Sequence, residues 1–212
     1  MAIQTNACLN CSMKVDQEAI RSRLEEAIDA QSRKHVSRAP SSDFYIRTYP
    51  LQLAEFHQLK GSWTVDHVLM RFSSVYGWMP RGIQAWNAGA VSELVSLLNS
   101  PRPNEEDLVR VASRCINNSM VGASKFLHFF DPDCFPIFDS VVASMWWPST
   151  SQAITLSRYR LYWCGVMKVS DTHSRAAQAW AKSWMGYEVT GIRAIEAQAF
   201  YTQRRIGMEN LP

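Results

Sequence analysis

Two ionisable residues flank an apolar segment in the middle of the chain. The stretch SMVGASKFLHFFDPDCFPIFDSVVASMWW, residues 119–147, places Lys125 before the hydrophobic run and Asp139 after it. An amine can attack a carbon that bears a leaving group. A fixed carboxylate can stabilise positive charge that develops on a sugar. Lys125 and Asp139 are therefore candidate catalytic residues, with a surface lysine and a simple helix cap as the plainer alternatives.

Local signals predict how these two residues are positioned. Asn104 is followed by three acidic residues, which predicts a helix that runs to about Asn117. The segment NSMVG is then a short turn, and ASKFLHFF is a second, apolar helix. Pro132 and Pro136 prevent that helix from continuing through DPDCFPI. Asp139 opens a further helix, so the order is helix, tight hairpin, helix, loop and a carboxylate at a helix N-terminus.

The rest of the chain also shows helical periodicity and no convincing strand pattern. A helix expected over residues 16–35 carries an apolar stripe of Ile20, Leu24, Ala27 and Ile28. Further helices are expected in residues 64–79, 82–100, 150–168, 171–186 and 190–205, with a connection over 38–50 bracketed by Pro40 and Pro50. The pattern predicts an all-α protein of about eight to ten helices. We expect one domain over 1–212, with a flexible arm at 1–15.

Composition excludes a disordered chain and a membrane-spanning one. Hydrophobic residues make up 47% of the 212 residues, and no apolar run is long enough to cross a bilayer. Five Cys and the lack of a signal peptide lead us to expect free thiols and a cytoplasmic monomer. Cys8 and Cys11 have the spacing of half a zinc site, but no second pair follows, so we expect no metal and no cofactor.

The net charge of +3 is small but unevenly placed. Residues 111–212 carry ten Lys and Arg against seven Asp and Glu, whereas residues 1–110 balance at twelve of each. A basic C-terminal half fits a polyanion such as DNA, although a slightly basic solvated face is the simpler interpretation. Candidate phosphate contacts are Arg158, Arg160, Lys168, Arg193, Arg204 and Arg205.

Residues 104–147 resemble the helix-hairpin-helix DNA glycosylases, which include endonuclease-III-type, adenine and 8-oxoguanine DNA glycosylases. In that superfamily a hairpin of roughly L-P-G-V-G precedes a Lys or Ser, and a loop leads to P-[VI]-x-D with the catalytic Asp. Here NSMVGASK stands in the hairpin place and FPIFD in the aspartate place. The likeness is nearest to small 8-oxoguanine-glycosylase-like proteins of bacterial and phage-defence genes.

Four departures from the family pattern matter. The spacing from the hairpin to the aspartate is a few residues shorter than usual. Met120 replaces the first hairpin Gly, which makes the turn less tight. Counted from Gly122, the nucleophile's place falls on Ser124, and Lys125 lies one residue later, a rotation of about 100° on a helix. A Ser in that place implies a monofunctional enzyme, and a Lys implies an additional abasic-site lyase. The four-cysteine iron–sulfur loop of the endonuclease-III branch is absent.

The resemblance implies a fold of two helical lobes with the active site between them. It implies an enzyme that flips a damaged or modified base out of double-stranded DNA and cleaves its N-glycosidic bond. Asp139 would stabilise the sugar and Lys125 would attack it. The hairpin backbone (Met120, Val121, Gly122, Ala123 and Ser124) would bind phosphate, and His128, Phe130, Trp146 and Trp147 would line the base pocket.

Two other functions fit parts of the same pattern. A non-catalytic helix-hairpin-helix module would keep the hairpin and use Asp139 only as a cap. A metal-dependent nuclease would use Asp131, Asp133 and Asp139, although it lacks the usual acid-plus-lysine spacing on strands. If the protein is a glycosylase, the excised base is expected to be 8-oxoguanine-like or a modified phage base such as glucosylated hydroxymethylcytosine. A modified phage base would imply a role in anti-phage defence.

Overall fold

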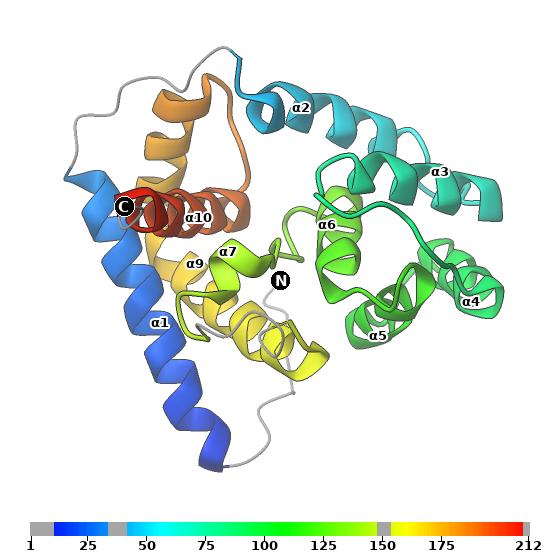
Figure 1. The fold of residues 1–212 in the computed structure, drawn as a ribbon, viewed down its shortest axis with the longest axis horizontal. Helices are drawn as coiled ribbons and strands as arrows, with labels where there is room; N and C mark the ends of the chain where they lie inside the picture. Colours follow the sequence, from blue (N-terminus) through cyan, green and yellow to red (C-terminus); the bar gives the residue numbers. More distant parts are fainter. Residues whose placement is uncertain (1–10, 34–41, 148–153, 210–212) are drawn as a thin grey trace.

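The computed structural model describes residues 11–33, 42–147 and 154–209, and within these ranges it is helical with no strand (Figure 1). The prediction of an all-α fold is therefore confirmed. The helices are α1 (Cys11–Ser32), α2 (Phe44–His57), α3 (Val65–Tyr76), α4 (Ala88–Leu98), α5 (Glu105–Cys115), α6 (Met120–Phe130), α7 (Ser140–Ala143), α9 (Leu156–Met185) and α10 (Gly191–Glu209).

These helices pack in two groups. The hairpin group consists of α2 to α6, in which α6 packs against α2, α3 and α5. The long-helix group consists of α1, α7, α9 and α10, in which α9 packs against α1 and α10 while α7 packs against α10. The segment between α6 and α7 crosses from one group to the other (Figure 1).

The first helix begins five residues earlier than predicted, at Cys11 rather than Asp16. The expected flexible arm over 1–15 thus overlaps α1 at 11–15, and its first ten residues, with Cys8, lie outside the described residues. The predicted apolar stripe is buried, with Ile20, Leu24, Ala27 and Ile28 between 1% and 3% exposed. Gly165 on α9 allows this close packing, because a Cβ there would lie 2.5 Å from Ile20.

The segment over 38–50 was expected to be a connection, but α2 begins at Phe44 within it, and Pro50 lies inside that helix. A helical proline removes the N–H that would bond the carbonyl four residues earlier, here Ile46. The Tyr187 hydroxyl donates to that carbonyl oxygen at 2.8 Å. The prediction was wrong because Tyr187, in the connection between α9 and α10, supplies the bond that Pro50 cannot.

The two helices expected in residues 150–168 and 171–186 form one helix, α9. Thr155 caps its start, since its side chain accepts from the Arg158 N–H, and Gly186 ends it in the left-handed conformation at φ 85°. Asp171 resembles a cap in sequence, but no Gly or Pro near it interrupts the helix. The result is a single 30-residue helix that spans the long-helix group.

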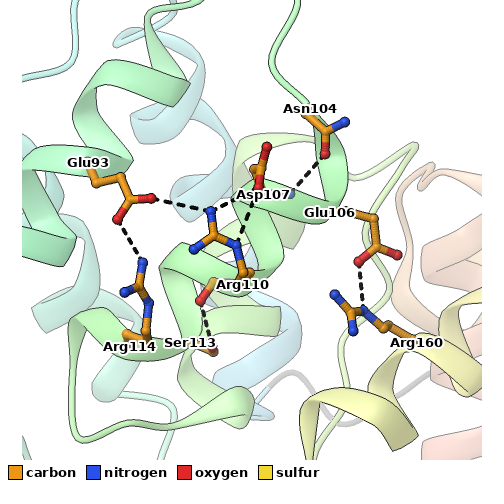
Figure 2. A network of polar contacts seen from close by, with 8 residues as sticks. All are labelled: Glu93, Asn104, Glu106, Asp107, Arg110, Ser113, Arg114 and Arg160. Atoms are coloured by element: carbon orange, nitrogen blue, oxygen red, sulfur yellow. Dashed lines mark hydrogen bonds and ion pairs between the residues drawn. The ribbon is translucent and has the colours of Figure 1, made fainter.

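Exposed ion pairs join α5 to its neighbours (Figure 2). Glu93 on α4 receives both Arg110 and Arg114 of α5, at 3.3 and 2.7 Å. Arg160 on α9 pairs with Glu106 on α5 at 2.7 Å, and so connects the two groups. All of these side chains are more than a third exposed, so each pair contributes only about 0–1 kcal/mol.

The hairpin between α5 and α6 turns on two asparagines rather than on glycine. Asn117 and Asn118 have φ of 53° and 49°, a region that Asn tolerates better than most residues. The Tyr76 hydroxyl donates to Ile116 O at 3.2 Å and fixes the entry to the turn. A Cβ at Gly122 would lie 2.9 Å from the Tyr76 ring, so this glycine serves the packing of Tyr76 in the structure.

Gly122→Ala is therefore expected to destabilise the protein by about 1–3 kcal/mol, because the new methyl overlaps a ring that is itself hydrogen-bonded. Gly89→Ala is the matched control: its Cβ would meet only the Asn87 side chain at 3.5 Å, and alanine favours helix, so this variant is expected to be neutral or more stable. Thermal melts of both variants measure the difference, and equal melting temperatures would contradict the role of Gly122.

Candidate active site

Asp139 lies at the N-terminus of α7. Its Oδ1 accepts from the backbone N–H groups of Val141 and Val142, both at 3.0 Å. The side chain is half-buried. Asp139 is therefore a helix cap, which is the simpler of the two roles considered for it from the sequence. Oδ1 alone makes both capping bonds. Within the described residues no hydrogen bond to Oδ2 is found. Oδ2 can therefore accept from a ligand.

Lys125 is a buried lysine on α6, only 7% exposed. Its Nζ donates to Trp78 O at 3.2 Å. Burial lowers the pKa of the Lys125 ammonium, the charge of Asp139 opposes that effect, and the charge of Arg193 adds to it. A lowered pKa increases the fraction of neutral amine, which is the nucleophilic form. The surface-lysine alternative does not describe this side chain.

Ser124 joins the helix of Lys125 to the residue before Asp139. The Phe138 N–H donates to Ser124 Oγ at 3.0 Å, and the Ser124 hydroxyl lies 3.2 Å from Phe138 O. Ser124 is fully buried. The Ser124 hydroxyl also lies 3.0 Å from Val121 O one turn earlier, so its oxygen accepts from the loop and its hydrogen is shared between two carbonyls. Lys125 is therefore the better candidate nucleophile of this turn.

The carboxylate loop, which we define as residues 131–138, is held by side chains along most of its length. From the long-helix side, Thr190 donates to Pro132 O at 2.8 Å and Trp163 Nε1 donates to Cys134 O at 2.7 Å. The Tyr159 hydroxyl donates to Pro136 O at 3.3 Å. Together with Ser124, these bonds fix the path of the backbone into Asp139.

A group of aromatic residues surrounds the lysine end of this site. Trp78, whose carbonyl receives Lys125, makes an edge contact with Tyr45 at 5.4 Å between ring centroids. Tyr49 stacks on Tyr187 at 6.2 Å. The Arg193 guanidinium lies 5.0 Å from the centre of the Tyr49 ring. Tyr45 is 37% exposed, so the cluster reaches the surface.

Sequence reasoning missed this aromatic cluster. Tyr45 and Tyr49 lie in the segment expected to be a connection, so their helical spacing was not considered. Arg193 was predicted to contact phosphate, but it is 7% exposed and pairs with Glu196 one turn away on α10. The one signal in the sequence was that Arg193 and Glu196 lie among apolar residues of α10, which indicates that the two charges are buried as a pair.

The four residues expected to line a base pocket do not gather in one place. Both ring nitrogens of the fully buried His128 are bonded within the protein, to Phe135 O and to the Tyr49 hydroxyl. Phe130 contacts Trp63 at 6.1 Å. Trp146 Nε1 donates to Ala19 O on α1 at 3.3 Å, while Arg158 covers the Trp147 ring at 5.0 Å.

The backbone donors of the hairpin are fewer than expected. The Gly122 N–H donates to Ser119 Oγ at 3.2 Å, and the Ala123 N–H donates to Ser119 O at 3.0 Å. The N–H groups of Met120 and Val121, in the first turn of α6, have no intrahelical acceptor. A phosphate at this helix end would therefore be bound by these two groups.

An exposed strap, residues 80–87, is fixed against the hairpin. Asn117 Oδ1 accepts from the N–H groups of Gln84 and Ala85 at 2.8 and 2.9 Å. The Asn87 N–H donates to Cys115 O at 2.8 Å. This pairing places Trp86, which is 50% exposed, opposite Ile116 at the end of α5. A firmly held, half-exposed Trp suggests a contact surface.

Other candidate groups are scattered. Arg160 pairs with Glu106, and Lys168 donates to Gln17 at 3.1 Å. Arg204 lies over Phe200, and the side chain of Arg205 is outside the described part. Asp131, Asp133 and Asp139 form no metal-binding cluster, and none is found elsewhere in the described ranges. No helix in those ranges is both long and apolar enough to cross a bilayer.

No family model, curated protein or solved structure matches this chain. What the site can do must therefore be argued from its own residues. The arrangement combines a buried amine, a half-buried carboxylate with one oxygen available, and a hydrogen bond from the residue before the carboxylate to the side chain of the residue before the amine.

Proposed function

We propose that this protein is a DNA glycosylase of helix-hairpin-helix type, which binds double-stranded DNA, flips a damaged or modified base and cleaves its N-glycosidic bond. The observation that carries the proposal is the bonding of Phe138 to Ser124, because it joins the Asp139 loop to the helix turn of Lys125. The bond therefore holds the residue before Asp139 against the helix turn that carries Lys125.

The chemistry follows from the two groups. The Lys125 amine attacks C1′ of the sugar, the bond to the base breaks, and the base leaves with the bonding electrons and takes up a proton. Asp139 stabilises the positive charge that develops on the sugar as this bond lengthens. Opening of the sugar ring then gives a Schiff base between Nζ and C1′, which borohydride reduces to a stable amine. Water in place of Lys125 would yield a free abasic site.

The two groups of helices would form the lobes on either side of this site, with the carboxylate loop between them. DNA would lie along the hairpin, where the Met120 and Val121 N–H groups can bind one phosphate without reading sequence. Trp86 on the strap, paired with Ile116 in the same hairpin, would stack on a base or fill the space that a flipped base leaves. The partly exposed Tyr45 ring, packed edge-on against the buried Trp78, offers a flat surface of the kind that a flipped base requires.

Trp86→Ala is expected to weaken DNA binding about tenfold, since stacking of one base on an aromatic ring contributes about 1–3 kcal/mol. Folding is expected to be unaffected because half of the side chain is exposed. Met70→Ala, which removes a 64% exposed side chain from α3, is the control and is expected to bind normally. Fluorescence anisotropy with a labelled duplex measures both affinities, and equal binding by the two variants would exclude Trp86 from the interface.

The defining experiment is base release in the presence of EDTA. The substrates are duplexes that contain 8-oxoguanine, uracil or alkylated bases, and DNA that carries glucosylated hydroxymethylcytosine. Alkaline cleavage scores abasic sites, and borohydride trapping scores covalent adducts. Release from any one of these substrates supports the proposal and identifies the class of base. Release that requires a divalent metal ion, or strand cleavage with no free base, would contradict it.

One observation favours a second candidate, a non-catalytic DNA-binding module. Asp139 caps α7 through Oδ1, which by itself accounts for an Asp at this position. Such a module would bind duplex DNA through the hairpin and Trp86, and would release no base from any substrate in the panel.

A further inference from the structure

His128 lies on α6 and has a defined tautomer. Its Nδ1 is 2.7 Å from Phe135 O, and a carbonyl oxygen can only accept, so Nδ1 carries the hydrogen. Its Nε2 is 2.8 Å from the Tyr49 hydroxyl. Burial and the charge of Arg193 lower the pKa of His128 to about 3, so the ring is neutral and Nε2 accepts from Tyr49.

His128 and Ser124 lie one turn apart on the same face of α6, and both bind the carboxylate loop. His128 donates to Phe135 and Ser124 bonds Phe138, the last residue before Asp139. Because the loop is attached to α6 at two points, both its distance from the helix and its orientation relative to the helix are fixed. The helix that makes both attachments also carries Lys125, next to Ser124.

Three further side chains, on α9 or just before α10, also bond this loop. Thr190, Trp163 and Tyr159 hold the carbonyls of Pro132, Cys134 and Pro136. These contacts would place Asp139 relative to α9 and α10. On the side of α6, the Asp131 N–H donates to Leu127 O at 2.8 Å where the loop leaves the helix, and Ser124 and His128 are the α6 side chains that bond the loop nearer to Asp139.

We propose that His128 is a positioning residue, whose Nδ1–H, backed by the Tyr49 hydroxyl, holds the carboxylate loop so that Asp139 and Lys125 address the same sugar. This inference rests on the proposed function and deepens it. It replaces the expectation that His128 contacts the base, because neither ring nitrogen is available to a ligand.

Substitutions of different shape separate positioning from simple core filling. Asn can place an amide N–H near the Nδ1 position, Gln reaches instead toward the Nε2 position, and Phe fills the volume without any donor. If His128 only fills the core, His128→Phe is the mildest change. If it positions the loop, His128→Asn retains the most activity and His128→Phe loses about 100-fold in rate, the effect of a displacement of about 1 Å.

The experiment measures single-turnover base release, DNA affinity and melting temperature for His128→Asn, His128→Gln, His128→Phe and Tyr49→Phe. We expect unchanged DNA affinity, a rate order of Asn above Gln and Phe, and an intermediate rate for Tyr49→Phe. Rates that follow the melting temperatures, with Phe as the most active variant, would overturn the proposal.

Two measurements on the protein without DNA keep this inference separate from the glycosylase proposal. Nitrogen NMR of the imidazole is expected to show the Nδ1–H tautomer at neutral pH. Exchange of the Phe138 amide hydrogen is expected to accelerate in His128→Phe and to stay slow in His128→Asn. An Nε2–H tautomer, or equal exchange in both variants, would overturn the anchoring role. Absence of base release by the wild type would instead refute the proposed function.

Discussion

Asp139→Asn is expected to reduce base release about 10³-fold while DNA binding and folding are retained. The variant loses the negative charge that would stabilise the sugar. Its side-chain oxygen can still accept from Val141 and Val142, and Asn caps helices about as well as Asp, so α7 remains intact. Single-turnover release, anisotropy and thermal melting test the three parts of this expectation.

Asp133→Asn is the matched control, because it makes the same chemical change to an exposed carboxylate in the carboxylate loop. It is expected to leave the rate unchanged. A rate equal to wild type in Asp139→Asn would reduce this residue to a helix cap and support the binding-module alternative. Equal losses in both variants would point to a general effect of charge on the loop.

Lys125→Met is expected to abolish the borohydride-trapped adduct and to make the protein more stable by about 1 kcal/mol or more. Burial lowers the pKa of this ammonium, so the folded state binds the proton less tightly than the unfolded state does. The resulting destabilisation is complete below the lowered pKa, shrinks as pH rises from that value, and disappears only above the ordinary lysine pKa of the unfolded chain. Methionine removes it altogether. Thermal melts at neutral pH measure the gain.

Lys182→Met, on the exposed surface of α9, is the control for both readouts and is expected to keep the adduct. In the wild type, adduct formation is expected to rise with pH as Lys125 deprotonates, with a midpoint below the ordinary lysine pKa. A persistent adduct in Lys125→Met would assign the nucleophile elsewhere. Loss of the adduct with continued base release would indicate that water attacks and that Lys125 serves only the lyase step.

Elements with local signals were predictable from the sequence. Thr64 and Asn104 cap α3 and α5 as expected, because a cap needs only a side chain and an N–H three residues away. The stripe on α1 was predictable for a similar reason, since it depends on helical spacing alone. The helix through Pro50 was not, because Tyr187, which compensates for the proline, is distant in sequence.

The candidate site was predictable in its residue types but not in its connections. Lys125 and Asp139 stood out by spacing, whereas the role of Ser124 as the link between them depends on a bond across a loop. The aromatic residues were the least predictable. Periodicity shows that a ring such as Phe130 or Trp146 packs inward, but not that one contacts Trp63 and the other α1.

The pair between Glu106 and Arg160 has a consequence for solution measurements. It is exposed and joins the two groups of helices, so added electrolyte screens it. Electrolyte also weakens phosphate contacts through counterion release. If the protein binds DNA as proposed, the salt dependence of that affinity would combine released counterions with a looser connection between the two groups of helices. Its slope would overstate the number of phosphates that the protein neutralises.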